Sequence, residues 1–195
     1  MRLSVVTSLL ALATLVGLAS GPVRAEAAAE ATQVRYNFTA RVPQPDARYR
    51  RQTVDYATNE KPGTIVIDTN RKCLYLVLGD GKAIRYGIGV GRDGFSWKGV
   101  EHVSRKAEWP TWTPPAEMIA RQPELAAYAT GMPGGPNNPL GARALYLGST
   151  LYRIHGTAEP WSIGRAVSSG CIRLLNEDVI DLYERVRIGA KVVVQ

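Results

Sequence analysis

A histidine, a cysteine and an arginine lie close together near the C-terminal end of the chain. His155 opens a His-Gly-Thr triplet, and Cys171 stands in the run Ser-Ser-Gly-Cys-Ile-Arg at 168–173, two residues before Arg173. A cysteine thiol has a pKa of about 8.5, so it becomes a nucleophile at neutral pH only beside a base or in a positive environment. An imidazole can supply that base. The pattern therefore predicts covalent catalysis by Cys171, with His155 moving the proton.

Two neighbours of the cysteine suit the same chemistry. Gly170 permits a tight backbone at the nucleophile, so that the N–H groups of Gly170 and Cys171 can converge on one point as an oxyanion hole. In an extended stretch, Arg173 points to the same side as Cys171 and can hold a substrate carboxylate there. A structural ion pair is the alternative role for Arg173.

This pattern closely resembles the catalytic motif of the L,D-transpeptidase (YkuD-type) family. The resemblance extends from about Pro62 to Gln195. It rests on four segments, whose combination is highly specific: Gly-Ile-Gly-Val-Gly at 87–91, Asn-Pro-Leu-Gly at 138–141, His-Gly-Thr at 155–157, and 168–173. The resemblance implies a mainly β fold, a sandwich or barrel with a C-terminal helix and a short helix in a Trp/Pro-rich lid segment.

The resemblance also implies an activity. Cys171 would form a thioester with a donor tetrapeptide stem of peptidoglycan and release D-Ala, while the backbone carbonyl of Gly156 holds the second ring nitrogen of His155. Transfer to the amine of another stem or of an envelope protein would make a cross-link or a protein attachment. Transfer to water would make the protein an L,D-carboxypeptidase. No cofactor and no metal is implied.

One position departs from the family pattern. Many relatives carry a second histidine immediately before the Gly-Cys pair, where this chain has Ser169. A hydroxyl can form hydrogen bonds but does not titrate near neutrality, so proton transfer falls to His155 alone. We expect an active enzyme in which Ser169 and Tyr152 contact the substrate. A non-catalytic peptidoglycan-binding module is the alternative that the departure supports.

Other interpretations of the same residues are weaker. The two cysteines of an exported protein, Cys73 and Cys171, can form a disulfide, although Cys73 begins an apolar strand where a buried thiol is ordinary. With His102 and His155 they lack the close pairs of a structural zinc site. A sortase-like enzyme usually has its His, Cys and Arg further apart, and in papain-like peptidases the cysteine precedes the histidine.

A dinucleotide fingerprint is also present but unconvincing. Residues 89–94 satisfy Gly-x-Gly-x-x-Gly, but the segment 95–99 opens no helix with a packing face, and the surrounding strands look antiparallel. We interpret the fingerprint as a bulged turn.

The elements that must position these residues are mostly strands. The segments 64–68, 73–78 and 83–90 alternate apolar and polar residues between turn sequences, which predicts an antiparallel meander. Strands are also predicted between 144 and 155 and at 192–194. A helix should start behind Asn176 as N-cap and end before Gly189, and a short helix at 115–122 should start behind Thr113. Trp109 and Trp112 lie in this Trp/Pro-rich segment, where they pack in the interior or against substrate.

The N-terminal residues and the composition indicate where the protein acts. Residues 1–25 have a positive start, an apolar run and small residues at 23–25, which predicts a cleaved signal peptide. Residues 26–61 read as a flexible N-terminal arm, and 62–195 as the catalytic domain. Cleavage would remove Arg2 and Arg24 and take the net charge from +7 to +5, which fits anionic envelope polymers, although solubility alone explains it equally well. The composition excludes collagen, coiled coils and disulfide scaffolds. We expect a periplasmic or envelope protein with no stable membrane span and no nucleic-acid partner.

Overall fold

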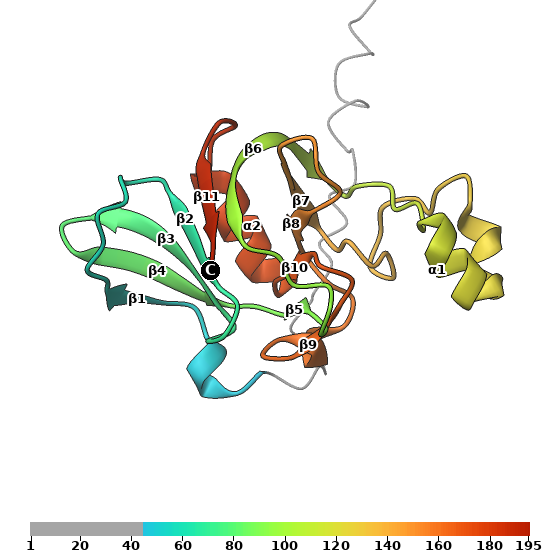
Figure 1. Cartoon of the computed structure of the whole chain (residues 1–195), viewed down its shortest axis with the longest axis horizontal. Coiled ribbons are helices and arrows are strands. Elements are labelled where there is room, and N and C mark those ends of the chain that lie inside the picture. Colours follow the sequence, from blue (N-terminus) through green and yellow to red (C-terminus); the bar gives the residue numbers. More distant parts are fainter. Residues whose placement is uncertain (1–44) are drawn as a thin grey trace, which may run out of the picture. The chain divides into compact units, whose positions relative to one another are not determined.

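A computed structural model describes residues 45–195 (Figure 1). The predicted signal peptide and the arm up to residue 44 lie outside these residues. None of the helices in the described part is long and apolar enough to cross a membrane. The strands are β1 Gln52–Asp55, β2 Ile65–Asp68, β3 Cys73–Gly79, β4 Lys82–Gly87, β5 Val90–Gly91, β6 Gly99–Glu108, β7 Arg143–Leu147, β8 Arg153–His155, β9 Ala166–Ser168, β10 Ile172–Arg173 and β11 Lys191–Val194; the α-helices are α1 Ala116–Arg121 and α2 Asn176–Arg185.

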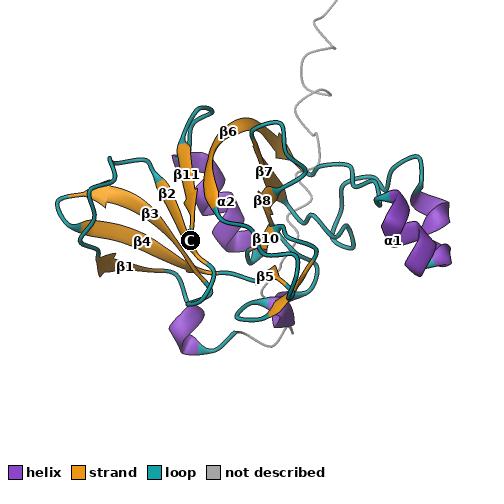
Figure 2. Ribbon diagram, in the orientation of Figure 1, coloured by secondary structure: helices purple, strands orange, loops and turns teal. Residues whose placement is uncertain are grey.

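Nine of these strands form one hydrogen-bonded series that changes direction at β6 (Figures 1 and 2). Its order is β1-β4-β3-β2-β11-β6-β7-β8-β10, and β5 and β9 form a separate parallel pair. The first half of β6 pairs with β11 and the second half with β7, with an irregular register between Val103 and Arg105. The predicted fold class, mainly β with a C-terminal helix and a short helix in the Trp/Pro-rich segment, is confirmed.

The predicted meander is present as β2, β3 and β4, which pair antiparallel. Its tight turns use backbone with positive φ at Lys72, Asp80 and Gly81. Alternate residues of the three strands face opposite sides, so that one set joins the main core and the other forms a smaller cluster around Tyr75. The main core also takes side chains from β6, β7, β8, β10, β11 and α2, and so joins both halves of the strand series.

Helix α2 begins one residue earlier than its predicted cap implies. Leu175 is the N-cap and makes no side-chain cap, whereas Asn176 is the first helical residue. The assignment of Asn176 as N-cap was therefore wrong, because its buried side chain bonds to other loops. The apolar face was predicted correctly, since Val179 and Leu182 are fully buried in the main core.

Helix α1 also lacks the predicted cap. It starts at Ala116 behind Pro115, whose φ of −59° and ψ of 150° are extended, and no side chain caps it. The prediction of Thr113 as N-cap was wrong. The next residue, Pro114, would have to be helical, but it precedes Pro115, and a residue before proline avoids helical backbone.

Part of the segment expected to be a flexible arm is a strand. Strand β1 pairs antiparallel with β4, with Val54 opposite Ala83. Just before it, the Arg51 guanidinium lies 3.7 Å from Asp178 Oδ1 and 3.3 Å from Asp181 Oδ1 of α2. Residues 51–55 therefore belong to the folded domain. This edge strand has no alternating apolar pattern in the sequence, because Val54 alone of its four residues is partly buried.

Candidate active site

The cysteine and the histidine lie on one face of two neighbouring strands. Strands β8 and β10 pair in parallel, with Ile154 opposite Ile172 and His155 opposite Arg173. Both isoleucines are buried in the main core. Side chains alternate along a strand and paired residues share a face. His155 and Arg173 therefore point away from that core, and Cys171, one residue before β10, shares their face.

The backbone carbonyl of Gly156 fixes the tautomer of His155. The side chain is 4% exposed, and its Nδ1 lies 2.5 Å from the carbonyl oxygen of Gly156. Because a carbonyl only accepts, Nδ1 carries the hydrogen and Nε2 keeps a free lone pair. Burial lowers the pKa of His155 to about 3; the Gly156 carbonyl opposes this, and Arg173 and Arg153 add to it. The imidazole is thus neutral at physiological pH. The contact expected from Gly156 is present.

Cys171 is a half-buried free thiol. Its Sγ lies 3.8 Å from the carbonyl oxygen of Leu151. Burial raises the pKa of the Cys171 thiol, while the guanidinium groups of Arg153 and Arg173 pull it down without cancelling the rise. The resting pair therefore consists of a neutral thiol and a neutral imidazole.

The second cysteine takes no part in this site. Cys73 is a buried free thiol at the start of β3, with its Sγ 3.5 Å from the Arg71 carbonyl oxygen. Burial raises the pKa of Cys73 as well. The disulfide considered from the sequence is absent, because both cysteines are free in the structure.

The loop before Cys171 is closed by a serine. Ser168 Oγ donates to the Cys171 carbonyl at 2.6 Å and accepts from the Gly170 N–H at 3.2 Å. The Gly170 N–H, which the sequence suggested for the oxyanion hole, therefore has a partner within its own loop in this structure. Within residues 45–195, no hydrogen bond is recorded for the Cys171 N–H, so this donor is available to an oxyanion. Ser169, in place of the second histidine, is exposed.

Gly170 is required here for a steric reason. Its φ is +107°, and a Cβ at this position would lie 2.5 Å from the ring carbon Cε1 of Tyr152. The Tyr152 ring in turn stacks on Trp97, with centroids 4.7 Å apart. Tyr152 thus packs beside the loop that carries Cys171, and it lies one residue before β8.

A buried asparagine, missed as a site residue, ties the histidine strand to its neighbours. Asn176 Oδ1 accepts from the Ala142 N–H at 2.8 Å, and its Nδ2 donates to the Thr157 carbonyl at 3.0 Å. A Cβ at Gly141 or Gly156 would lie within 2.3 Å of this amide oxygen. Asn176 therefore fixes the backbone that carries the Gly156 carbonyl. The sequence signal was the asparagine in a cap-like position, three residues after the motif segment 168–173.

The glycine segment 87–91 holds the other strand of the site. Gly89 and Arg173 exchange two backbone hydrogen bonds of 2.9 Å, and a Cβ at Gly89 would meet the Ser162 carbonyl oxygen at 2.7 Å. Arg173 Nη1 lies 2.6 Å from Glu159 Oε2, so this arginine has a carboxylate partner within the protein. Of the two roles considered for Arg173, the ion pair is the one present.

Comparison with known proteins agrees with this geometry. Residues 62–194 match the family described as the YkuD L,D-transpeptidase catalytic domain. The chain belongs to this L,D-transpeptidase family. It is 38% identical over 135 residues to "Probable L,D-transpeptidase YbiS" and 39% identical over 137 residues to "Probable L,D-transpeptidase ErfK/SrfK", both from Escherichia coli K12. These matches cover 67% and 66% of this chain but only 43% and 42% of those proteins, so the chain spans less than half of their length.

Solved structures share the fold. An L,D-transpeptidase from Mycobacterium smegmatis superposes with a TM-score of 0.52 at 20% identity, covering 68% of this chain and 58% of that one. A Brucella melitensis protein described as "Probable carnitine operon oxidoreductase caia" superposes with a TM-score of 0.53 at 50% identity, covering 77% of this chain and 96% of that one. The family assignment rests on the catalytic-domain match and the E. coli relatives.

In this L,D-transpeptidase domain, the Asn-Pro-Leu-Gly segment at 138–141 anchors the Trp/Pro-rich part of the chain. Asn138 is buried, and its Nδ2 donates to the carbonyls of Pro110, Met132 and Pro133 at 3.0–3.1 Å. Trp112 is buried and pairs through its backbone with Met132. Trp112 thus has the interior role of the two considered.

Two other kinds of site were weighed from the sequence, a metal site and a dinucleotide site. Within the described residues, no cluster of three or more His, Cys, Asp or Glu side chains can hold a metal ion. The Gly-x-Gly-x-x-Gly segment forms β5 and a turn, and no helix follows it before β6. The surrounding strands were expected to be antiparallel, which is wrong for β5, since it pairs in parallel with β9.

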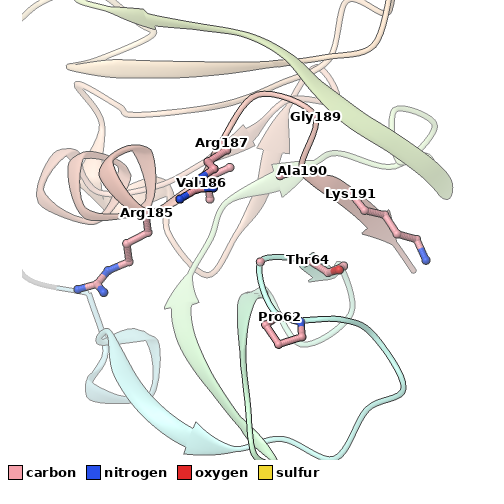
Figure 3. A pocket seen from close by; sticks show the side chains of 9 residues that line it. Pro62, Thr64, Arg185, Val186, Arg187, Gly189, Ala190 and Lys191 are labelled. Carbon is pink, nitrogen blue, oxygen red and sulfur yellow. The ribbon is translucent and has the colours of Figure 1, made fainter.

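A groove of about 520 Å³ lies elsewhere in the domain, between the end of α2, the start of β11 and residues 62–64 (Figure 3). Two of its cations are already paired, because Arg185 bonds to Asp181 and Lys191 to Glu60. No residue of the Cys171 site lines it.

Proposed function

We propose that this chain is a cysteine-dependent L,D-transpeptidase that acts on peptidoglycan stem peptides in the cell envelope. The observation that carries the proposal is the pairing of β8 with β10. It sets a free thiol on the same face as a histidine whose Nε2 lone pair is available, in a chain of the L,D-transpeptidase family.

The first half of the reaction acylates the thiol. Cys171 Sγ attacks the carbonyl carbon of the third stem residue and forms the S–C bond, while the thiol proton passes to Nε2 of His155. The C–N bond then breaks, and D-Ala leaves as an amine that takes the proton from the imidazolium. A thioester and a neutral imidazole remain.

The second half returns the enzyme to its starting state. An acceptor amine attacks the thioester carbon and gives its proton to His155, the C–S bond breaks, and the departing sulfur regains a proton from the imidazolium. An amine from a second stem gives a cross-link, and an amine from an envelope protein gives an attachment. Water in place of the amine gives the carboxypeptidase reaction.

The remaining groups have supporting roles. The Cys171 N–H stabilises the oxyanion, because the Gly170 N–H is engaged by Ser168. Tyr152 and the exposed Ser169 contact the donor beside the thiol. The Gly156 carbonyl keeps the imidazole oriented and favours its protonated form during transfer. Export of the protein by the signal sequence at 1–25 brings this site to its substrate.

The test is the intact mass of the purified protein after incubation with a carbapenem, followed by a disaccharide-tetrapeptide. We expect an adduct that maps to Cys171, its loss in Cys171→Ala, and release of D-Ala from the tetrapeptide. Cys73→Ala is the matched control, and it should acylate like the parent because Cys73 is buried away from the site. An adduct that persists in Cys171→Ala would overturn the proposal.

The product identifies the acceptor in the second half of the reaction. Cross-linked dimer identifies an amine acceptor, whereas tripeptide with no dimer identifies water. A parent protein that binds the fragment without an adduct or D-Ala release would instead be a peptidoglycan-binding module.

A further inference from the structure

A row of side chains runs across four strands and ends at the nucleophile. Arg105 of β6 pairs with Tyr146 of β7, and Tyr146 pairs with Arg153 of β8. Continuing the parallel register of β8 and β10 by one residue places Arg153 opposite Cys171. Directly paired residues share a face. Arg105, Tyr146, Arg153 and Cys171 therefore lie in line on the face that carries His155.

The two arginines of this row hold uncommitted positive charge. The Arg105 guanidinium lies 3.5 Å from the centroid of the Tyr146 ring, and the Arg153 guanidinium lies 5.5 Å from it. Within residues 45–195, no ion pair is recorded for either arginine, and Arg153 Nε is buried without a hydrogen-bond partner. Arg173, by contrast, is paired with Glu159. The charge available next to the thiol is that of Arg153.

We propose that Arg153 binds a carboxylate of the donor beside the amide bond that Cys171 cleaves. The inference rests on the proposed function and adds the group that recognises the donor. Adjacent strands lie about 4.8 Å apart, so a guanidinium opposite Cys171 reaches a carboxylate one residue from the attacked carbonyl. Its planar pair of N–H donors matches a carboxylate. The Tyr146 ring supports the guanidinium, and Arg105 extends the positive strip away from the thiol.

The two residues that flank the cleaved bond can each carry a carboxylate: the leaving D-Ala at its C-terminus, and the third residue on its side chain. Three donors tell them apart. The first is a tetrapeptide with both carboxylates, the second is its C-terminal amide, and the third has L-lysine as the third residue and so lacks the side-chain carboxylate.

The experiment measures kcat/KM for release of the fourth residue from each donor by the parent protein, Arg153→Gln and Arg153→Lys. A charge-assisted hydrogen bond predicts that the parent loses roughly 10- to 100-fold on the donor that lacks the bound carboxylate. In Arg153→Gln that penalty should shrink to about 2-fold. Arg153→Lys should recover part of it. Arg187→Gln, at an exposed arginine of the Figure 3 groove, removes the same charge and should keep the full penalty.

The outcomes separate this inference from the function on which it rests. If the parent releases the fourth residue from no donor, the proposed function fails. If the parent is active and Arg153→Gln slows all three donors equally, Arg153 has only a structural or general electrostatic role and the inference is overturned. If Arg153→Gln removes the penalty only for the C-terminal amide, the leaving D-Ala carboxylate is the ligand. If it removes the penalty only for the lysine donor, the side-chain carboxylate of the third residue is the ligand.

Discussion

The role of Asn176 gives the sharpest test of how the fold positions the histidine. Replacement by alanine removes the acceptor of the Ala142 N–H at 2.8 Å and the donor to the Thr157 carbonyl at 3.0 Å. Asn176 is 6% exposed, so water cannot replace both contacts. A buried polar group left unpaired costs about 1–3 kcal/mol, and two of them predict a loss of about 2–5 kcal/mol in the free energy of unfolding.

That loss is large enough to measure by thermal unfolding. In a domain of this size, 1 kcal/mol shifts the melting temperature by about 2–4 °C, so Asn176→Ala should melt about 4–20 °C lower. Acylation of Cys171, followed well below the melting temperature, should also slow by roughly 10- to 100-fold, because the strand that carries the Gly156 carbonyl is no longer fixed. Asn70→Ala, in an exposed turn, is the control and should change neither quantity.

A second substitution gives a readout that depends on pH. Asn176→Asp keeps an acceptor for the Ala142 N–H, but an ionised carboxylate cannot donate to the Thr157 carbonyl. The protonated carboxyl can, so its pKa in the folded protein should exceed its unfolded value of about 3.9. The folded state then binds more protons than the unfolded chain, and the variant should gain stability as the pH falls toward about 3.9.

The outcome for Asn176→Ala decides the argument. A melting temperature of Asn176→Ala within about 2 °C of the parent would refute the reasoning.

Two further predictions concern the nucleophile loop and the base. Gly170→Ala should lower the free energy of unfolding by about 1–3 kcal/mol and abolish acylation, because its Cβ would lie 2.5 Å from the Tyr152 ring at a φ of +107°. Gly81→Ala is the control: its φ is +67° with open space around it, so it should cost only about 1 kcal/mol. Equal losses for the two variants in unfolding experiments would contradict this steric argument. The pKa of His155 is about 3 in the folded protein against 6.5 unfolded, so the unfolded chain binds the extra proton between these values and the free energy of unfolding should fall as pH decreases from 6.5. His155→Gln should remove about 1 kcal/mol per pH unit of that slope in urea titrations, and parallel curves for the two proteins would exclude a buried neutral imidazole.

The sequence predicted the parts of the fold that rest on local patterns. The strands of the meander were recognisable because alternation and turn residues are visible within a few positions. The same holds for the apolar face of α2. Strand β1 was missed because, of its four residues, Val54 alone is partly buried.

The site was predictable in composition but not in detail. The residue types at 155 and 171 predict a base and a nucleophile, and the resemblance to the family predicted the contact of His155 with the Gly156 carbonyl. The parallel pairing of β8 with β10 was not visible, because these strands have three and two residues and owe their register to long-range contacts. The engagement of the Gly170 N–H by Ser168 depends on a turn geometry that no residue type specifies.

The two arginines near the thiol oppose one step of the reaction and assist another. The guanidinium groups of Arg153 and Arg173 lower the pKa of the Cys171 thiol, which favours the attacking thiolate. The same charges lower the pKa of His155, which disfavours the imidazolium that the attack must create. Glu159 already offsets the charge of Arg173. A donor carboxylate on Arg153 would offset the second charge and strengthen His155 as a base only when substrate is present. On this account the enzyme keeps a neutral, weakly reactive thiol at rest, and the carboxylate that Arg153 recognises also prepares His155 to accept the proton.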